Sequence, residues 1–194
     1  MGTTTQPIKN KKDLLNFRNY YKVIEKKPRN YALIVLGLNS ALRIGDLLSL
    51  HWQQVYNSKT GQYCEHISII EEKTNKQNTI AINSAITEAL DFYRHSLDTI
   101  KPADYIFPSQ KAPYEKLSRS QAFRIVKKAA VSCGMCQYIS CHSLRKTFGY
   151  YAWQNGIPPV LLMSIYNHSS YEITKHYLCI DQEEKDEVYL KNFL

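Results

Sequence analysis

His142 and Arg145 stand three positions apart in the stretch CHSLRKTFGYYAWQNG, residues 141–156. The spacing of apolar residues predicts a helix here, and residues three apart project from the same helix face. An imidazole and a guanidinium side by side can both hydrogen-bond a phosphate, the guanidinium through two parallel N–H groups. An ordinary surface helix also carries such pairs, so the meaning of this one depends on what accompanies it.

The charge of the chain indicates a polyanionic partner. Lysine and arginine number 25 against 17 acids, a net charge of +8, although residues 181–194 are acidic. The rest of the chain is therefore more basic than the total, which is typical of nucleic-acid-binding proteins. A basic surface that is simply solvated is the alternative interpretation.

Length and composition are those of a folded protein with one domain. The chain has 194 residues, of which 44% are hydrophobic and 22% charged. No apolar run approaches the roughly 18 residues of a membrane span, and MGTTTQPIKNKK lacks the apolar core of a secretory signal. We therefore expect a cytoplasmic protein without a membrane partner, whose five cysteines are reduced thiols.

Most of the elements that must position His142 and Arg145 show the spacing of apolar residues that is typical of helices. The runs HISII and TIAI flank the polar stretch EEKTNKQN, which predicts one β-hairpin. The expected fold class is α+β, mainly α-helical with a small antiparallel β-sheet. Helices are predicted over residues 11–25, 29–42, 43–50, 84–100, 118–133, 142–156, 158–167, from 169 through 177, and over 181–194.

Four stretches together resemble the catalytic domain of the tyrosine recombinases, or phage-type integrases. ALRIGDLLSLHW resembles the first arginine box of that family, and EEKTNKQNTIAI resembles its lysine-bearing hairpin. HSLRKTFGYYAWQNG resembles its His-x-x-Arg box, and NHSSYEITKHY resembles its third box, where a histidine precedes the nucleophilic tyrosine by nine residues. Each stretch alone is a weak signal, but the four occur in the family's order.

The resemblance implies a catalytic set on DNA. Two arginines can hold both non-bridging oxygens of a phosphodiester and stay charged at any working pH. A lysine can protonate the leaving 5′-oxygen, one histidine can assist proton transfer from the phenol, and the other can donate to the phosphate. The implied residues are Arg43, Lys73, His142, Arg145, His168 and the nucleophile Tyr177.

Alternatives remain at three positions. Lys76 lies in the same turn as Lys73 and is the competing general acid. Asp46, one turn after the first arginine, is expected to orient an arginine rather than to catalyse. The cysteines of CGMC with Cys141 and His142 could instead hold a structural zinc, although their spacing fits such sites poorly.

The sequence departs from the family in two places. Tyr166 and Asn167 precede His168, where the family usually has a Leu-Gly pair, so the turn there is expected to differ slightly. Only about 28 residues precede the first matching helix. We therefore expect residues 1–194 to form a single catalytic domain without the family's separate N-terminal core-binding domain.

The two ends carry separate expectations. Residues 1–10 are expected to be flexible. Residues 181–194 are expected to form a tail helix, which is too short to be stable alone and must pack on a neighbouring protomer or on its own. The resemblance favours exchange between protomers.

These observations predict a site-specific DNA recombinase that works through a 3′-phosphotyrosyl link and needs no metal or other cofactor. The expected partners are double-stranded DNA, further protomers that form a tetramer on it, and accessory DNA-bending proteins, in a bacterial or phage-encoded setting. The alternatives are a type IB topoisomerase-like enzyme, a catalytically silent DNA-binding regulator of the same fold, and a metal-stabilised interaction module.

Overall fold

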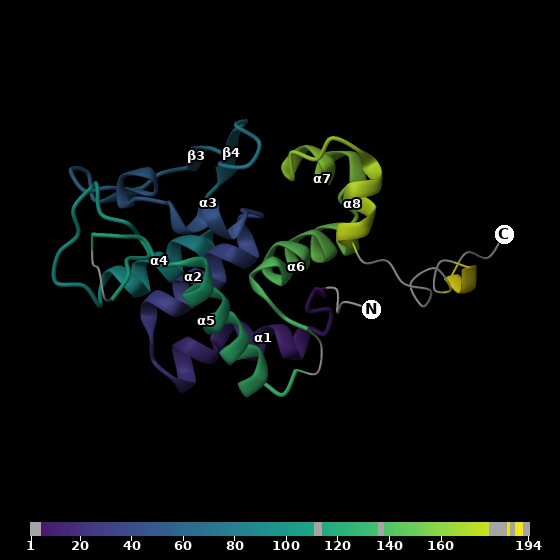
Figure 1. The fold of residues 1–194 in the computed structure, drawn as a ribbon, viewed down its shortest axis with the longest axis horizontal. Helices are drawn as coiled ribbons and strands as arrows, with labels where there is room; N and C mark the ends of the chain where they lie inside the picture. The colour runs from purple at the N-terminus through teal and green to yellow at the C-terminus, as the bar shows by residue number, and fades with distance from the viewer. Residues whose placement is uncertain (1–4, 111–113, 136–137, 179–185, 187–188, 192–194) are drawn as a thin grey trace.

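Helices form most of the molecule, as predicted. The computed structural model describes residues 5–110, 114–135, 138–178, 186 and 189–191 (Figure 1). The helices are α1 (Lys11–Asn19), the π-helix Tyr20–Ile24, α2 (Pro28–Asn39), α3 (Ile44–Leu48), the 3₁₀ turn Trp52–Gln54, α4 (Ser84–Arg94), α5 (Arg119–Ser132), α6 (Cys141–Gln154), α7 (Pro159–Ile165) and α8 (Tyr171–Leu178). The predicted fold class, mainly helical with small antiparallel sheets, is confirmed.

Helix α2 runs through the middle of the core. Its residues from Asn30 to Gly37 are all buried, and it packs against both α4 and α6. A side chain at Gly37 would meet Leu144 of α6, whose Cδ1 lies 2.5 Å from the position of an added Cβ. This close approach fixes α6, and with it Arg145, relative to the rest of the core.

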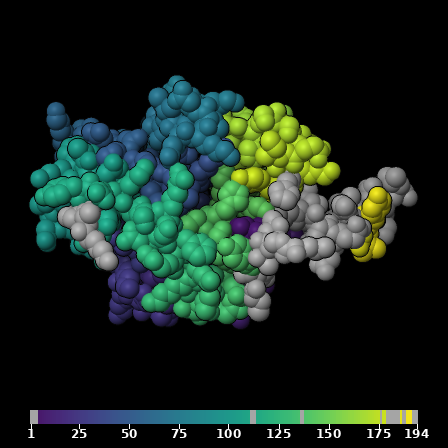
Figure 2. All heavy atoms as spheres, in the orientation of Figure 1, coloured from purple at the N-terminus to yellow at the C-terminus, as the bar shows by residue number. Residues whose placement is uncertain are grey.

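The hairpin of β3 (His66–Ile70) and β4 (Gln77–Ala81) is the predicted one. Ile67 is fully buried and pairs with Ile80 on the facing strand, which sets the register. The hairpin and the pair α7–α8 lie next to each other along one edge of the molecule (Figures 1 and 2). The loop between β3 and β4 therefore lies on the same side of the molecule as α7 and α8.

A second two-stranded sheet, which the sequence pattern does not predict, forms between β1 (Tyr56–Asn57) and β2 (Gln62–Tyr63). The stretch NSKTGQ between them is recognisable as a turn, and Gly61 supplies its left-handed residue at φ +71°. Two-residue strands are too short to show alternation in sequence, so only the turn carries a signal.

Helix α4 ends earlier than its apolar spacing predicts, because side chains bind its last free carbonyls. Helix α4 stops at Arg94 rather than at residue 100, where His95 Nδ1 lies 2.8 Å from the Asp91 carbonyl and the Ser96 hydroxyl donates to Tyr93. By contrast, the Ser118–Gln121 capping box begins α5 as predicted.

Residues 5–9 of the N-terminal segment are held against the rest of the molecule. Residues 5–9 lie along α6, where the Ile8 amide donates to the Thr147 hydroxyl at 2.9 Å and Lys146 Nζ donates to the Thr5 carbonyl at 2.9 Å. The expected flexibility is therefore corrected for these residues, because hydrogen bonds and the burial of Ile8 hold them.

The predicted tail helix lies largely outside the described residues. Of residues 181–194 the structure describes 186 and 189–191, which have helical backbone, and Tyr189 and Leu190 are exposed. None of the described helices is long and apolar enough to span a membrane.

Candidate active site

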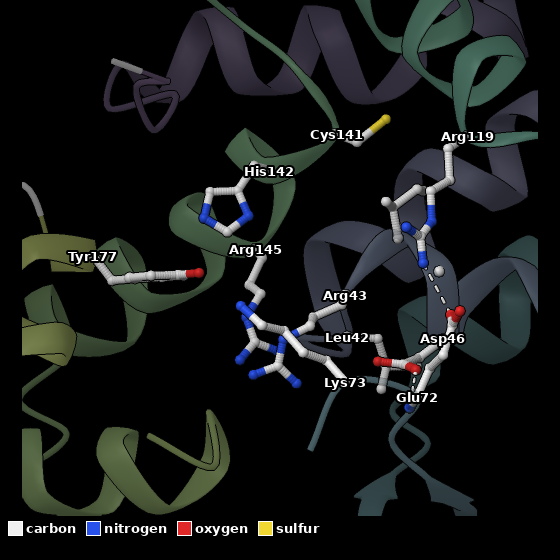
Figure 3. A pocket seen from close by; sticks show the side chains of 12 residues that line it. Leu42, Arg43, Asp46, Glu72, Lys73, Arg119, Cys141, His142, Arg145 and Tyr177 are labelled. Atoms are coloured by element: carbon white, nitrogen blue, oxygen red, sulfur yellow. Dashed lines mark hydrogen bonds and ion pairs between the residues drawn. The ribbon is translucent and has the colours of Figure 1, made fainter. Parts of the chain in front are cut away.

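A cleft of about 490 Å³ gathers residues from five parts of the chain (Figure 3). Its walls are α3, the loop between β3 and β4, the start of α5, α6 and α8. Five of the six predicted site residues line it, namely Arg43, Lys73, His142, Arg145 and Tyr177. The sixth, His168, lies behind Tyr177, with the two ring centroids 4.7 Å apart. Segments far apart in the sequence thus meet at one place.

Arg43 is held by a carboxylate that the sequence analysis missed. It occupies the N-cap position of α3 with an extended backbone, and its Nη1 lies 2.5 Å from Glu71 Oε2. The Glu71 side chain is fully buried and also accepts hydrogen bonds from Thr74 Oγ1 at 2.7 Å and Asn78 Nδ2 at 2.9 Å.

The environment of Glu71 keeps it ionised. Burial alone would raise the pKa of the carboxyl group, but hydrogen bonds from Thr74, Arg43, Asn167 and Asn78 lower it to about 2. A signal for this residue does exist in the sequence. Glu71 continues the inward-facing alternation of Ile67 and Ile69 in β3, so an acid is due to point into the core.

Asp46 performs a different task from the expected one. Its Oδ1 accepts the Glu72 amide at 2.9 Å, and no arginine contact is present for it among the described residues. The expectation that it orients an arginine is corrected: it ties the hairpin loop to α3. Glu72 in turn pairs with Arg119 at 2.9 Å on the rim of the cleft.

Lys73 extends from this loop into the cleft, beside Arg43 and Arg145 (Figure 3). Lys76, its competitor in the same turn, is not among the lining residues. The loop conformation explains the difference. The Glu71 and Lys76 backbones pair across the loop at 2.9 Å, and Asn75 adopts the left-handed conformation at φ +52°, which together fix the direction of each side chain.

Arg145 lies almost entirely buried in α6, with 1% of its surface exposed. Its Nη1 donates to the Ala41 carbonyl and its Nη2 to the Tyr166 carbonyl, the latter at 2.8 Å. Burial, and then the nearby charge of Arg43, lower the pKa of the guanidinium. Arginine nonetheless stays charged at neutral pH, so this is a fixed positive charge at the floor of the cleft.

The ring of Tyr177 is enclosed by other aromatic rings. Centroid distances are 4.8 Å to His142, 4.7 Å to His168 and 5.3 Å to Tyr166, with the rings edge-on or tilted. Its hydroxyl points toward His142 and Arg145 (Figure 3). The half-buried phenol is thus directed at the two side chains with which its chemistry would begin.

His168 is a neutral imidazole at pH 7. Burial, followed by the charges of Arg145 and Arg43, lowers its pKa to about 4. Its Nδ1 lies 3.0 Å from the Thr174 hydroxyl. A neutral ring that accepts this hydroxyl at Nδ1 carries its proton on Nε2, where it can donate to a phosphate oxygen.

The zinc alternative gains no support from the described residues. Cys136 lies outside them, and among the others no group of three or more His, Cys, Asp or Glu side chains is arranged to hold a metal. In the absence of a metal, burial raises the pKa of the Cys141 thiol to about 11, so the thiol is protonated at neutral pH.

Fold and site together define a tyrosine recombinase, the class of enzyme that breaks and rejoins DNA through a tyrosine. The chain belongs to the phage integrase family, whose model matches residues 9–184. It is 35% identical over 184 residues to the probable integrase/recombinase YoeC of Bacillus subtilis, covering 95% of this chain and 94% of that one. It is 30% identical over 164 residues to a tyrosine recombinase of Pseudothermotoga lettingae, covering 84% of this chain and 54% of the relative.

Solved structures agree on the fold. The XerA recombinase superposes with a TM-score of 0.78 at 18% identity, covering 98% of this chain and 64% of its own. The XerH site-specific recombinase, bound to a palindromic difH substrate after cleavage, gives a TM-score of 0.76 at 19% identity, covering 97% of this chain and 53% of its own. The chain thus spans somewhat more than half of these recombinases.

Proposed function

We propose that this chain cleaves one strand of double-stranded DNA at a specific site and forms a 3′-phosphotyrosyl bond through Tyr177. The observation that carries the proposal is the position of the phenol. It points from α8 into a cleft whose floor and walls carry Arg145, Arg43 and Lys73 (Figure 3). A nucleophile, fixed positive charge and a proton donor are the groups that phosphodiester cleavage requires.

In the proposed reaction Tyr177 Oη attacks phosphorus and the bond to the 5′-oxygen breaks. His142 accepts the phenolic proton, and Lys73 gives a proton to the departing oxygen, so the DNA is left with a 5′-hydroxyl. Attack by a 5′-hydroxyl on the phosphotyrosine reverses the step and restores the phosphodiester. No external energy source is needed, because one phosphate ester replaces another.

Charge at the phosphate is the second requirement. In the proposal Arg43 and Arg145 bind the two non-bridging oxygens, on which negative charge gathers in the transition state, and His168 adds a hydrogen bond. Arg43 is partly exposed at the cleft, whereas Arg145 is buried. The two guanidinium groups come from different elements, so they can approach a phosphate from two directions.

Several protomers are proposed to act together. A lambda integrase dimer has been solved on a COC′ core site, and it covers 92% of this chain with a TM-score of 0.68. We propose the same kind of partner for this chain, namely double-stranded DNA, with further protomers up to a tetramer, accessory DNA-bending proteins and a setting in the bacterial cytoplasm. Residues 1–194 would serve as the catalytic domain, and the tail of residues 181–194 would be exchanged between neighbours.

Capture of covalent complexes tests the proposal even though the DNA target is unidentified. The protein is incubated with nicked DNA duplexes of randomised sequence, denatured, and the DNA that remains attached is sequenced. We expect enrichment of one sequence, joined to Tyr177 through its 3′ phosphate. Tyr177→Phe should abolish capture while DNA binding is kept, whereas Tyr171→Phe, an exposed tyrosine on the same helix, should capture normally. Capture by the Tyr177→Phe protein would reject the assignment.

A further inference from the structure

Tyr166 touches three residues of the site from behind. It caps the end of α7 and is completely buried. Its ring centroid lies 4.5 Å from the Arg145 guanidinium carbon, 5.0 Å from the His168 ring and 5.3 Å from the Tyr177 ring. The sequence pattern assigns it no role in the reaction, because its position in the chain marks it only as a departure from the usual leucine.

Arg145 and Tyr166 are joined by two hydrogen bonds, each from a side chain of one residue to the backbone carbonyl of the other. The Tyr166 hydroxyl donates to the Arg145 carbonyl at 2.8 Å, and Arg145 Nη2 donates to the Tyr166 carbonyl at 2.8 Å. The guanidinium lies over the ring between these bonds, in cation–π contact. Its Nε has no hydrogen-bond partner among the described residues, so the stack and the two carbonyls determine where this group stands.

Helix α6 makes room for this tyrosine with Gly149. An added Cβ at Gly149 would overlap Tyr166 Oη and lie 3.0 Å from its Cζ, inside contact distance. Within a helix a glycine is less favourable than an alanine. Gly149 lies where the Tyr166 hydroxyl reaches the backbone of α6, and a larger residue would not leave room for it.

We propose that Tyr166 is a positioning residue for the reaction, which sets the orientation of the Arg145 guanidinium toward the phosphate. The inference rests on the proposed function. A leucine at this position would fill much of the same core volume but would provide neither the aromatic face under the guanidinium nor the donor to the Arg145 carbonyl. The role is thus separable from packing, because packing alone needs only an apolar side chain.

Two substrates separate the two roles. The duplex captured most efficiently from the randomised pool is prepared with an ordinary phosphate, and again with a methylphosphonate, whose replaced oxygen carries no charge. An arginine that is misplaced harms mainly the charged substrate, because the neutral one needs less charge stabilisation. General loss of packing harms both alike.

Tyr166→Leu should lower the cleavage rate of the phosphate substrate about 100-fold and that of the methylphosphonate less than about 10-fold. Gly149→Ala, which displaces the tyrosine without replacing it, should show the same imbalance. Tyr21→Leu is the matched control, because Tyr21 is similarly buried and donates to the Ile125 carbonyl at 3.0 Å, and neither residue lines the cleft. It should lower both rates equally. An equal loss on both substrates for Tyr166→Leu would overturn the proposal.

A measurement without DNA distinguishes failure of this inference from failure of the proposed function. Phenylglyoxal modifies accessible guanidinium groups, and the modified peptides are identified by mass spectrometry. Arg145 should be protected in the wild type and in Tyr21→Leu but modified at least about 10-fold faster in Tyr166→Leu, because the ring that covers it is gone. Unchanged protection would refute the hold of Tyr166 on Arg145, even if no duplex were captured by any variant.

Discussion

The Arg43 guanidinium and the Glu71 carboxylate form an ion pair across 28 residues of sequence, with 2.5 Å between Nη1 and Oε2. The pair joins the start of α3 to the end of β3 at the base of the cleft. Because the two charges balance, the positive charge of the cleft that no carboxylate offsets lies chiefly at Arg145 and Lys73, where the proposed function requires a phosphate to bind. The pair also ties the hairpin loop to the helix that carries the first arginine.

Replacement of Glu71 with glutamine should therefore slow cleavage more than it weakens DNA binding. The amide has the same shape but offers Arg43 no charge, so the arginine loses its fixed orientation and we expect the single-turnover cleavage rate to fall roughly 10- to 100-fold. Binding is measured with the same duplex by gel shift. Glu72→Gln, which alters an exposed acid in the next position, is the matched control. Equal losses in the two variants would contradict the role of Glu71.

The same variant should show a defined pH dependence of stability. The folded-state pKa of Glu71 is about 2, below the ordinary value of 4.5, so its contribution is fully present above pH 4.5 and is lost as the pH falls toward 2. We expect urea unfolding to give the largest difference between wild type and Glu71→Gln at neutral pH, with a smaller difference at pH 3. A difference that grows on acidification would contradict this assignment.

Lys73 and Lys76 can be distinguished by the leaving group. A substrate with sulfur in place of the 5′-bridging oxygen releases a thiolate, which needs no proton. Lys73→Ala should cleave the ordinary substrate about 100-fold more slowly than wild type and regain most of that loss on the sulfur substrate. Lys76→Ala, the matched control from the same loop, should lose little on either. Rescue of Lys76→Ala instead would move the general acid to that residue.

Arg43→Lys tests whether geometry or charge matters at the first arginine. An ammonium keeps the charge but cannot donate through a planar fork to both Glu71 and a phosphate, so cleavage should fall by roughly 10². Affinity for the duplex should fall less than the rate. If binding and cleavage fall by the same factor, Arg43 is a general phosphate contact rather than part of the catalytic set.

His168 should make the folded protein less stable on mild acidification. Its folded-state pKa of about 4 lies below the ordinary 6.5, so the unfolded chain takes up the proton first and the free energy of unfolding declines as the pH falls from 6.5 to 4. His168→Asn cannot titrate there and should show a shallower decline in chemical denaturation. An unchanged slope would mean that another group dominates this range.

Much of the site could be predicted because its signals are local. The interval from His168 to Tyr177 and the spacing of His142 and Arg145 lie within single stretches of sequence, and the structure brings these residues together around one cleft. Capping boxes and turn residues locate α5 and the hairpin for the same reason. A capping box and a turn each depend on residues that are close together in the sequence.

What sequence reasoning missed depends on contacts between distant segments. The alternation in β3 indicates only that Glu71 points inward, whereas its role depends on its pairing with Arg43 and on its contacts to Thr74 and Asn78. Asp46 accepts the Glu72 amide of the hairpin instead of binding an arginine. Its position one turn after Arg43 allows either partner, so the sequence alone does not distinguish them. The spacing of residues within one segment does not identify the distant partner of either side chain.

The turn before His168 shows how a change of residue type can keep a backbone conformation. Asn167 adopts φ +52°, the left-handed conformation for which glycine is the usual residue and asparagine the commonest substitute. Asn167, which stands where the family usually has glycine, therefore adopts a backbone conformation that glycine favours. The asparagine side chain also helps to lower the pKa of Glu71, which a glycine could not do. The asparagine thus keeps a backbone conformation that glycine favours and adds an interaction with Glu71 that a glycine lacks.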